Sequence, residues 1–431
     1  MKKNIAFDAH CHIFTLEYAL KEARHMLHDM LSGSYPKDIP EDRAIKLQTK
    51  AKVIKNPVIQ LLIQFYELIS ASLGSEEENL DFLLKKASGA MSDHEWIVVP
   101  LMMDIYYMYA YPVHKGKEVT YMERKMLEIP DEAELQKDWN EILDDLKKYI
   151  ESKKPDDALK KGTGLDHFLE AIEAERDVGA TITFKAGLES AKGIFERKGQ
   201  TEGYYYHLIN LEKLVEKRKG ELYPFIAVDP RRPGIIDEIV GGKYIGNDGP
   251  FYGVKLYPRL GYHPECEPLD ALYQYCNDQK IPITFHCGEG GFPPFKNWEH
   301  ADFGHPENFR PILDKYPDLK INFAHLGSPI QDCDWSGEII GLMEDFETVY
   351  SDLSCYVDID NLKAAKKLWD DNSVLQSRLM FGTDFDVMYF MGEINLDVYF
   401  DNFKSTFSES ELTLLIHDNP TKFFGVVLAP S

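Results

Sequence analysis

The feature that most constrains the fold is a series of eight short apolar runs, each ending at or near a polar residue or a residue of the metal-ligand type. Runs rich in Ile, Val and Phe are typical of strands buried on both faces of a parallel sheet. Helical patterns separate the runs, and this alternation predicts a (β/α)8 TIM barrel of the α/β class. The runs span Asn4–His12, Trp96–Asp104, Tyr223–Pro230, Phe251–Pro258, Ile281–Gly288, Leu319–Gly327, Thr348–Ser354 and Arg378–Phe385.

The spacing of the later runs supports a barrel. Lys255 and His286 lie 31 residues apart, close to the about 31 residues per unit expected when ~250 residues form eight βα units. His286 and His325 are 39 residues apart, and 59 residues separate His325 from Asp384, which leaves room for two units. We therefore predict a single barrel domain over residues 1–431.

The residues in excess of a minimal barrel lie in two mainly helical insertions, 13–95 after the first strand and 105–222 after the second. Amphipathic patterns predict helices at 58–73, 131–153 and 204–219. Because both insertions follow strands, we expect them on the C-terminal face of the barrel, as a cap over the active site or as a homodimer surface. A separate folded domain inside either insertion stays open.

The charge of the chain restricts its partners. The chain has 72 Asp and Glu against 48 Lys and Arg, a formal net charge of −24. Nucleic acids and anionic membrane surfaces need a basic face, so neither is an expected partner. We find no run of ~18 apolar residues and no apolar stretch of signal-peptide length at the N-terminus, and predict a cytoplasmic protein. Six cysteines without a CxxC pair fit reduced thiols.

Candidate metal ligands lie at the ends of the predicted strands, which converge on one mouth in a (β/α)8 barrel. An HxH pair alone is a weak signal, but here it is followed in order by two further histidines and an aspartate at strand ends. Burying these groups at one mouth without a metal would cost desolvation free energy. Imidazole and carboxylate ligands suit Zn²⁺, Mn²⁺ or Fe²⁺. The candidates are His10, His12, Lys255, His286, His325 and Asp384.

Six segments together resemble the amidohydrolase superfamily, specifically the amidohydrolase-2 (amidohydrolase-related) family. They are FDAHCHIF, YGVKLYPRLGYHP, TFHCGEGG, NFAHLGSP, FGTDFDV and HDNPTKFFG, and they run from residue 4 to residue 425. The family includes aminocarboxymuconate-semialdehyde decarboxylase and related decarboxylases and hydrolases. The two insertions lie outside the resemblance.

The resemblance implies a role for each candidate ligand. It implies that one divalent ion, Zn²⁺ in the first place with Mn²⁺ or Fe²⁺ as alternatives, is held by His10, His12, His286 and Asp384. Asp384 would also take a proton from the bound water. His325 would be the catalytic histidine, which polarises a carbonyl when protonated, or a ligand of a second ion.

Lys255 has three interpretations. It is a carboxylated lysine that bridges two metal ions, a cation that binds a substrate carboxylate, or a structural residue paired with Asp229 or Asp352. Tyr257 and Arg259 follow it and are candidate substrate-binding residues, since a guanidinium can grip a carboxylate with two hydrogen bonds. The alternative for Arg259 is a solvated loop residue.

These observations predict a metal-dependent hydrolase that cleaves a C–N or C–O acyl bond, in an amide, lactone or ester. The expected substrate is a small molecule that bears a carboxylate. A nonoxidative decarboxylase or a hydratase of the same family is the second hypothesis, and release of CO₂ would distinguish a decarboxylase. A non-catalytic binding protein is a third, which intact ligands disfavour.

Overall fold

The computed structural model describes nine segments of the chain. They are residues 4–32, 75–118, 132–152, 202–246, 249–288, 290–292, 300–327, 334–385 and 396–425. The helix predicted at 58–73 lies outside the described residues.

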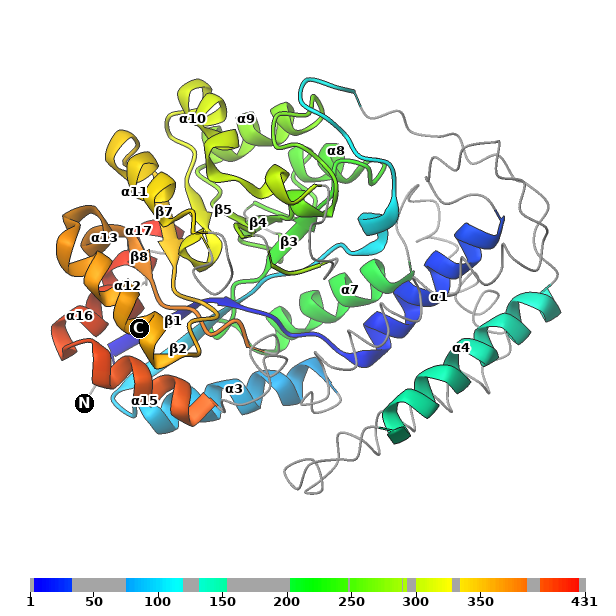
Figure 1. Cartoon of the computed structure of the whole chain (residues 1–431), viewed down its shortest axis with the longest axis horizontal. Coiled ribbons are helices and arrows are strands. Elements are labelled where there is room, and N and C mark those ends of the chain that lie inside the picture. Colours follow the sequence, from blue (N-terminus) through cyan, green and yellow to red (C-terminus); the bar gives the residue numbers. More distant parts are fainter. Residues whose placement is uncertain are drawn as a thin grey trace.

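The eight predicted strands are all present in the described part of the chain, and every pair is parallel (Figure 1). Strands β3 to β8 pair in sequence order, and β1 pairs with β2. Strands β3 to β8 are buried along their whole length, as expected for strands covered on both faces. The strands are β1 (Asn4–Cys11), β2 (His94–Pro100), β3 (Phe225–Val228), β4 (Gly253–Leu256), β5 (Ile283–Phe285), β6 (Ile321–Phe323), β7 (Val349–Asp352) and β8 (Leu379–Met380).

Backbone contacts connect the two sheets into a ring. A parallel bridge between Leu101 and Phe225 joins the end of β2 to β3. On the other side, the N–H of Ala9 in β1 donates to the carbonyl of Phe381, directly after β8, over 3.0 Å. The strands therefore follow one another in cyclic order, which confirms the predicted (β/α)8 arrangement.

Helices alternate with the strands and cover the outside of the sheet (Figure 1). The α-helices are α1 (Leu16–Ser32), α3 (Glu76–Ala90), α4 (Glu132–Ser152), α7 (Glu202–Lys217), α8 (Ile235–Val240), α9 (Leu269–Gln279), α10 (Arg310–Lys315), α11 (Ser336–Asp345), α12 (Ile359–Asp371), α13 (Ser373–Arg378), α15 (Leu396–Thr406), α16 (Glu409–Thr413) and α17 (Asn419–Phe424). Short 3-10 helices lie at Tyr106–Tyr109, Pro258–Leu260, Ala301–Gly304, Pro306–Phe309 and Ala324–Gly327, and a π-helical turn at Leu414–Asp418.

The described parts of both insertions are mainly helical, as predicted. Helices α4 and α7 match the two predicted charged helices within two residues at each end. Helix α1 from the first insertion packs against α7 from the second (Figure 1). Gly203 permits this close approach, because a Cβ atom there would lie 2.8 Å from the backbone nitrogen of Glu22.

A buried arginine connects this helix pair to the barrel. Arg232, which follows β3, donates two 2.7 Å hydrogen bonds to the carboxylate of Asp104, which follows β2. Its guanidinium lies 4.1 Å from the ring centroid of Tyr204 on α7 and 3.9 Å from the carboxylate of Glu22 on α1. One cation therefore joins its own segment to three others that are distant in sequence.

Removing one partner of this pair is expected to destabilise the protein. Asp104→Ala leaves the buried charge of Arg232 without its main partner and should lower the free energy of unfolding by about 3–5 kcal/mol. Asp318→Ala removes an exposed partner of Lys280 and should cost less than about 1 kcal/mol. Urea unfolding of both variants tests this, and equal losses would contradict it.

A buried histidine on α7 makes stability depend on pH. His207 donates from Nε2 to the carbonyl of Ile13 over 3.1 Å, whereas its Nδ1 is buried without a hydrogen-bond partner. Burial lowers the pKa of His207 to about 3, below the ~6.5 of an unfolded histidine. The unfolded state therefore binds more protons between these values, and stability is lost as the pH falls through this window.

We expect His207 to contribute about 1.4 kcal/mol of lost stability per pH unit between pH 6 and pH 4. In His207→Gln, an amide can replace the donor and nothing titrates there. The pH slope of its unfolding free energy should be shallower than that of the wild type by this amount. Parallel slopes for the two proteins would contradict the assignment.

Candidate active site

Four of the candidate side chains meet at the C-terminal ends of the strands. His10 comes from β1, His12 follows it, and His325 and Asp384 follow β6 and β8. The ligand atoms of His10, His325 and Asp384 all lie within 4.8 Å of one another. The Nε2 atoms of His12 and His10 lie 3.1 Å and 3.4 Å from Oδ1 of Asp384. All four side chains are buried.

Hydrogen bonds at Nδ1 orient the imidazoles of His10 and His12. His10 donates from Nδ1 to Oδ2 of Asp352 over 3.0 Å, and His12 donates from Nδ1 to the carbonyl of Leu101 over 2.8 Å. A ring nitrogen that donates in this way leaves the lone pair on Nε2. Both Nε2 atoms face Asp384, so the HxH pair directs two imidazole nitrogens at one carboxylate.

Ser354 sets the tautomer of His325. Its hydroxyl donates to Oδ1 of Asp352, and its oxygen lies 2.8 Å from Nδ1 of His325. Since the hydroxyl proton is directed to the carboxylate, Nδ1 of His325 is the donor in this contact. Nε2 of His325 therefore also carries a lone pair when the ring is neutral.

Asp352 is the shared acceptor of this network. Besides His10 and Ser354, it accepts hydrogen bonds from Nδ2 of Asn322 over 2.7 Å and from the backbone N–H of His325 over 3.1 Å. Burial raises the pKa of Asp352, but His10 and the other donors lower it by more and hold the pKa well below its usual range. Asp352 is therefore ionised, and its carboxylate holds the imidazole of His10 and the backbone of His325 in position.

Asp8 fixes the position of Asp384 relative to the HxH pair. Its carboxylate accepts hydrogen bonds from the backbone N–H of Thr383 over 2.9 Å and from the Thr383 hydroxyl over 2.6 Å. The N–H of Asp384 in turn donates to the carbonyl of His10 over 2.7 Å. These contacts join the first strand to the last at the site.

The backbone is strained at three positions of the site. His325, Cys355 and Asp384 have φ angles of 62°, 65° and 51°, in the left-handed region that residues with a side chain rarely adopt. Each such residue costs of order 1–3 kcal/mol, and such residues cluster at active sites. The barrel and the hydrogen-bond network hold these side chains in place against that cost.

Buried polar atoms without hydrogen-bond partners mark the centre of the site. Within the described segments these atoms are Nε2 of His10, Oδ1 of Asp384 and Nζ of Lys255. Burial of such atoms is unfavourable unless a ligand satisfies them. Two of the three are an imidazole nitrogen and a carboxylate oxygen, a donor set that fits a divalent ion such as Zn²⁺, Mn²⁺ or Fe²⁺.

The protonation states also fit a metal ion. Burial lowers the pKa of His10 to about 4, so its ring is neutral at pH 7. Burial raises the pKa of Asp384, but the surrounding histidines lower it by more, and the pKa lies well below its usual range. A neutral imidazole beside an ionised carboxylate binds a cation without first losing a proton.

His286 lies beside this group in the structure. Its ring centroid is 5.3 Å from that of His325 and 4.0 Å from that of Tyr257. Its Nε2 contacts the carbonyl of Gly290 over 2.9 Å. The described residues therefore bring together His10, His12, His325 and Asp384, and the ligand role of His286 stays a prediction.

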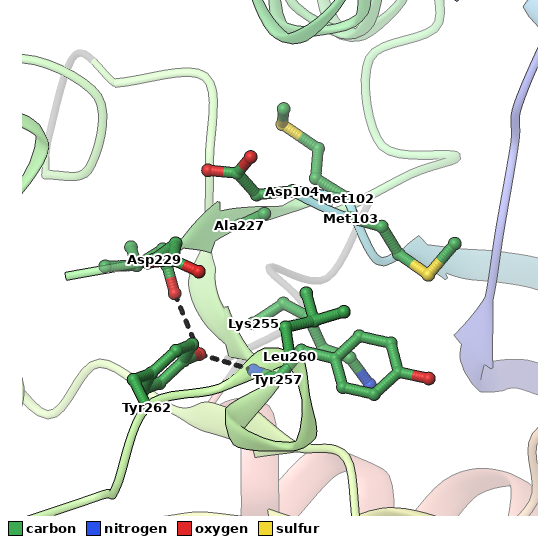
Figure 2. Close-up of a pocket in the computed structure, with 10 residues that line it drawn as sticks. Met102, Met103, Asp104, Ala227, Asp229, Lys255, Tyr257, Leu260 and Tyr262 are labelled. Carbon is green, nitrogen blue, oxygen red and sulfur yellow. Dashed lines mark hydrogen bonds between the residues drawn. The ribbon is translucent and has the colours of Figure 1, made fainter. Parts of the chain in front are cut away.

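Lys255 extends from β4 into a small cavity whose walls come from the ends of β2, β3 and β4 (Figure 2). Asp352 and Asp384 are the carboxylates that act most strongly on it, while burial lowers its pKa to about 8. Lys255 does not form the ion pair with Asp229 that was one of its three interpretations. Asp229 instead accepts hydrogen bonds from Arg231 over 2.6 and 2.8 Å. The cavity is lined by Met102, Met103, Asp104, Ala227, Val228, Asp229, Lys255, Tyr257, Leu260 and Tyr262.

Tyr257 and Arg259 hold a loop that lies over His286. The Tyr257 hydroxyl accepts a hydrogen bond from the N–H of Phe292 over 2.8 Å, and Arg259 donates to the carbonyl of Phe292 over 3.3 Å. Arg259 is 2% exposed, so the alternative of a solvated loop arginine is wrong. Gly291 is required in this loop, since a Cβ atom there would lie 1.9 Å from the Tyr257 hydroxyl.

The sequence reasoning missed several residues that shape the site. Asp352 was considered only as a partner of Lys255, and Ser354 and Cys355 were not considered. Their position in the sequence could have indicated them. Asp352, Ser354 and Cys355 lie within four residues at the end of the seventh apolar run. Strand ends of this kind converge on the mouth of a barrel.

A family model described as Amidohydrolase matches residues 180–426, which is more than half of the chain. The chain belongs to this amidohydrolase family. It is therefore an enzyme, and the donor set at the mouth of its barrel lies where such an enzyme has its active site. The comparison agrees with the resemblance seen in the sequence. No curated protein sequence matches the chain.

Several solved structures are similar to part of the chain at low identity. An uncharacterised TIM-barrel protein from Bordetella bronchiseptica is 19% identical over 51% of this chain and 72% of its own, with a TM-score of 0.39. A probable 2-pyrone-4,6-dicarboxylic acid hydrolase from Acinetobacter baumannii is 15% identical over 51% and 78%, with a TM-score of 0.39. A 2,6-dihydroxybenzoate decarboxylase from Rhizobium is 15% identical over 52% and 77%, with a TM-score of 0.37.

Among the described residues, no helix of this amidohydrolase is both long and apolar enough to cross a membrane.

The support that Asp352 gives to the histidines predicts a loss of metal affinity when it is changed. Asp352→Asn replaces one acceptor oxygen by an NH₂ group, so the donors of His10 and Asn322 cannot both be satisfied. We expect about 10–100-fold weaker binding of Zn²⁺, measured by competition with a chromogenic chelator. Asp345→Asn, at an exposed pair with Arg310, is the matched control. Equal affinities of the two variants would contradict a supporting role.

Proposed function

We propose that this amidohydrolase is a metal-dependent hydrolase that cleaves a C–N or C–O acyl bond in a small substrate bearing a carboxylate. The observation that carries the proposal is the set of buried atoms without partners. His10 and Asp384 offer a nitrogen and an oxygen to a cation, and Lys255 offers an ammonium group to an anion. A site that binds a metal ion and a carboxylate side by side suits such a substrate.

His10, His12 and Asp384 would hold the ion, proposed as Zn²⁺, with Mn²⁺ or Fe²⁺ as alternatives. His286 would complete the site if its imidazole turned away from the carbonyl of Gly290. A divalent ion held there would lower the pKa of bound water to ~7 and would so supply a nucleophile at neutral pH. A second ion would need His325 and a carboxylated Lys255.

The chain's own groups then have distinct tasks. Asp384 is ionised and buried, so it can accept the proton of the attacking water and pass it to the leaving group. His325 has its Nδ1 engaged with Ser354, and burial lowers its pKa. The neutral ring therefore has a lone pair on Nε2, which can bind a metal ion or accept a hydrogen bond but cannot donate one to an oxyanion. Lys255 would hold the substrate carboxylate, with Tyr257 and Arg259 closing the site above it.

Decarboxylation is the second candidate, and the same lysine favours it. In the described part of the chain, Nζ of Lys255 is buried without a hydrogen-bond partner, next to the proposed metal centre. A cation there could hold the very carboxylate that is lost. The two reactions differ in their products, because hydrolysis adds water across the cleaved bond and decarboxylation releases CO₂.

Metal content is the first test. Protein prepared without chelators should contain about one Zn or Mn ion per chain by plasma mass spectrometry, and His10→Ala should contain far less. About two ions per chain would favour the binuclear site with Lys255 carboxylated. Absence of metal after incubation with Zn²⁺ and Mn²⁺ would contradict metal-dependent catalysis and favour a binding protein.

Lys255→Met tests the carboxylate site separately. The variant should keep its metal content but lose most of its affinity for carboxylate-bearing esters, lactones or amides, with KM raised at least about tenfold, since a charge-assisted contact is worth about 1.5–3 kcal/mol. Lys320→Met is the matched control, because Lys320 donates to the carbonyls of Lys422 and Phe423. Equal KM values in the two variants would remove Lys255 from the substrate site.

A further inference from the structure

The thiol of Cys355 contacts the proposed metal-binding carboxylate. Cys355 lies in the turn after β7, and its Sγ donates a hydrogen bond to Oδ2 of Asp384. Both side chains are buried. The contact joins the end of the seventh strand to the end of the eighth, at residues 29 positions apart.

The two oxygens of Asp384 have different surroundings. Oδ2 receives the thiol of Cys355. Oδ1 is buried, has no hydrogen-bond partner among the residues that the structure describes, and faces Nε2 of His12 and His10 over 3.1 Å and 3.4 Å. Nε2 of His10 is likewise buried without a hydrogen-bond partner. The two atoms without partners among the described residues therefore face each other, and the thiol binds the other oxygen of the carboxylate.

We propose that Cys355 is a positioning residue, which holds Oδ2 of Asp384 so that the carboxylate presents Oδ1 alone to the ion. The inference rests on the metal centre proposed above. A carboxylate that can rotate freely offers an ion either oxygen or both, whereas a carboxylate with one oxygen occupied by a donor binds through the other. Mutation of a residue that hydrogen-bonds to a metal ligand typically lowers the affinity for the metal by about 10–100-fold.

The thiol acts as a donor and not as a further ligand. Its Sγ donates to Oδ2 of Asp384, whereas the Nε2 atoms of His10 and His12 face the other oxygen, Oδ1. The backbone of Cys355 has a φ of 65°, a conformation that glycine adopts without strain. A glycine at this position would therefore keep the turn and remove only the donor.

Three variants separate the thiol from the backbone. Cys355→Ala removes the donor, Cys355→Gly removes the donor and relieves the strain, and Cys355→Ser keeps a donor of similar size. The affinity for Zn²⁺ and for Mn²⁺ is measured by competition with a chromogenic chelator. We expect about 10–100-fold weaker binding in the Ala and Gly variants, and recovery of most of the affinity in the Ser variant.

Cys276→Ala is the matched control, because Cys276 is a buried cysteine on α9 away from these contacts, and it should bind both ions like the wild type. Unfolding curves of the metal-free proteins show which variants are folded, and the Gly and Ser variants carry the test if the Ala variant does not fold. Unchanged affinity in the Ala or the Gly variant overturns the proposal. A wild type that binds neither ion overturns the metal centre itself, and this inference with it.

Discussion

The carboxylate of Asp352 is the interaction on which the rest of the site depends. It accepts hydrogen bonds from the side chains of His10, Asn322 and Ser354 and from the backbone of His325. A buried carboxylate is tolerated only when donors surround it, and these donors are the groups whose orientation matters. The same contacts that stabilise the anion therefore fix two imidazoles with their Nε2 atoms directed into the mouth of the barrel.

The closure of the barrel brings Asp384 to the same point. Strands β1 and β8 are the two ends of the chain's barrel, and Asp8 and Thr383 join them through two hydrogen bonds. The strained turn at Asp384 is held by its bond to the carbonyl of His10. A loop on a free surface would relax from such a conformation, whereas a turn tied to both terminal strands of a barrel cannot do so without opening the sheet.

Cations near the mouth fall into two groups with different functions. Arg231 and Arg232 make two-pronged contacts with Asp229 and Asp104, and their charges serve to join segments of the fold. Lys255 has no hydrogen-bond partner in the described part of the chain. A buried ammonium group is unfavourable without a nearby anion, and the carboxylates of Asp352 and Asp384 are the charges that stabilise Lys255 most strongly in the structure.

The strand order and the ligand types follow from the sequence alone. Buried parallel strands need continuous apolar runs, and the period of two places His10 and His12 on one face, so both features are local. The family resemblance likewise lies in short segments.

Only the tertiary structure decided which groups support and complete the site. Asp352 contacts His10 across 342 positions, and Asp8 contacts Thr383 across 375, so no local pattern indicates either pair. The orientation of the His325 side chain is set by its contact with Ser354, and that of His286 by its contact with the carbonyl of Gly290. These orientations decide that His325 lies with His10 and Asp384 and that His286 lies beside them. Such rotations are determined by neighbours that folding brings together, and residue types at strand ends do not encode them.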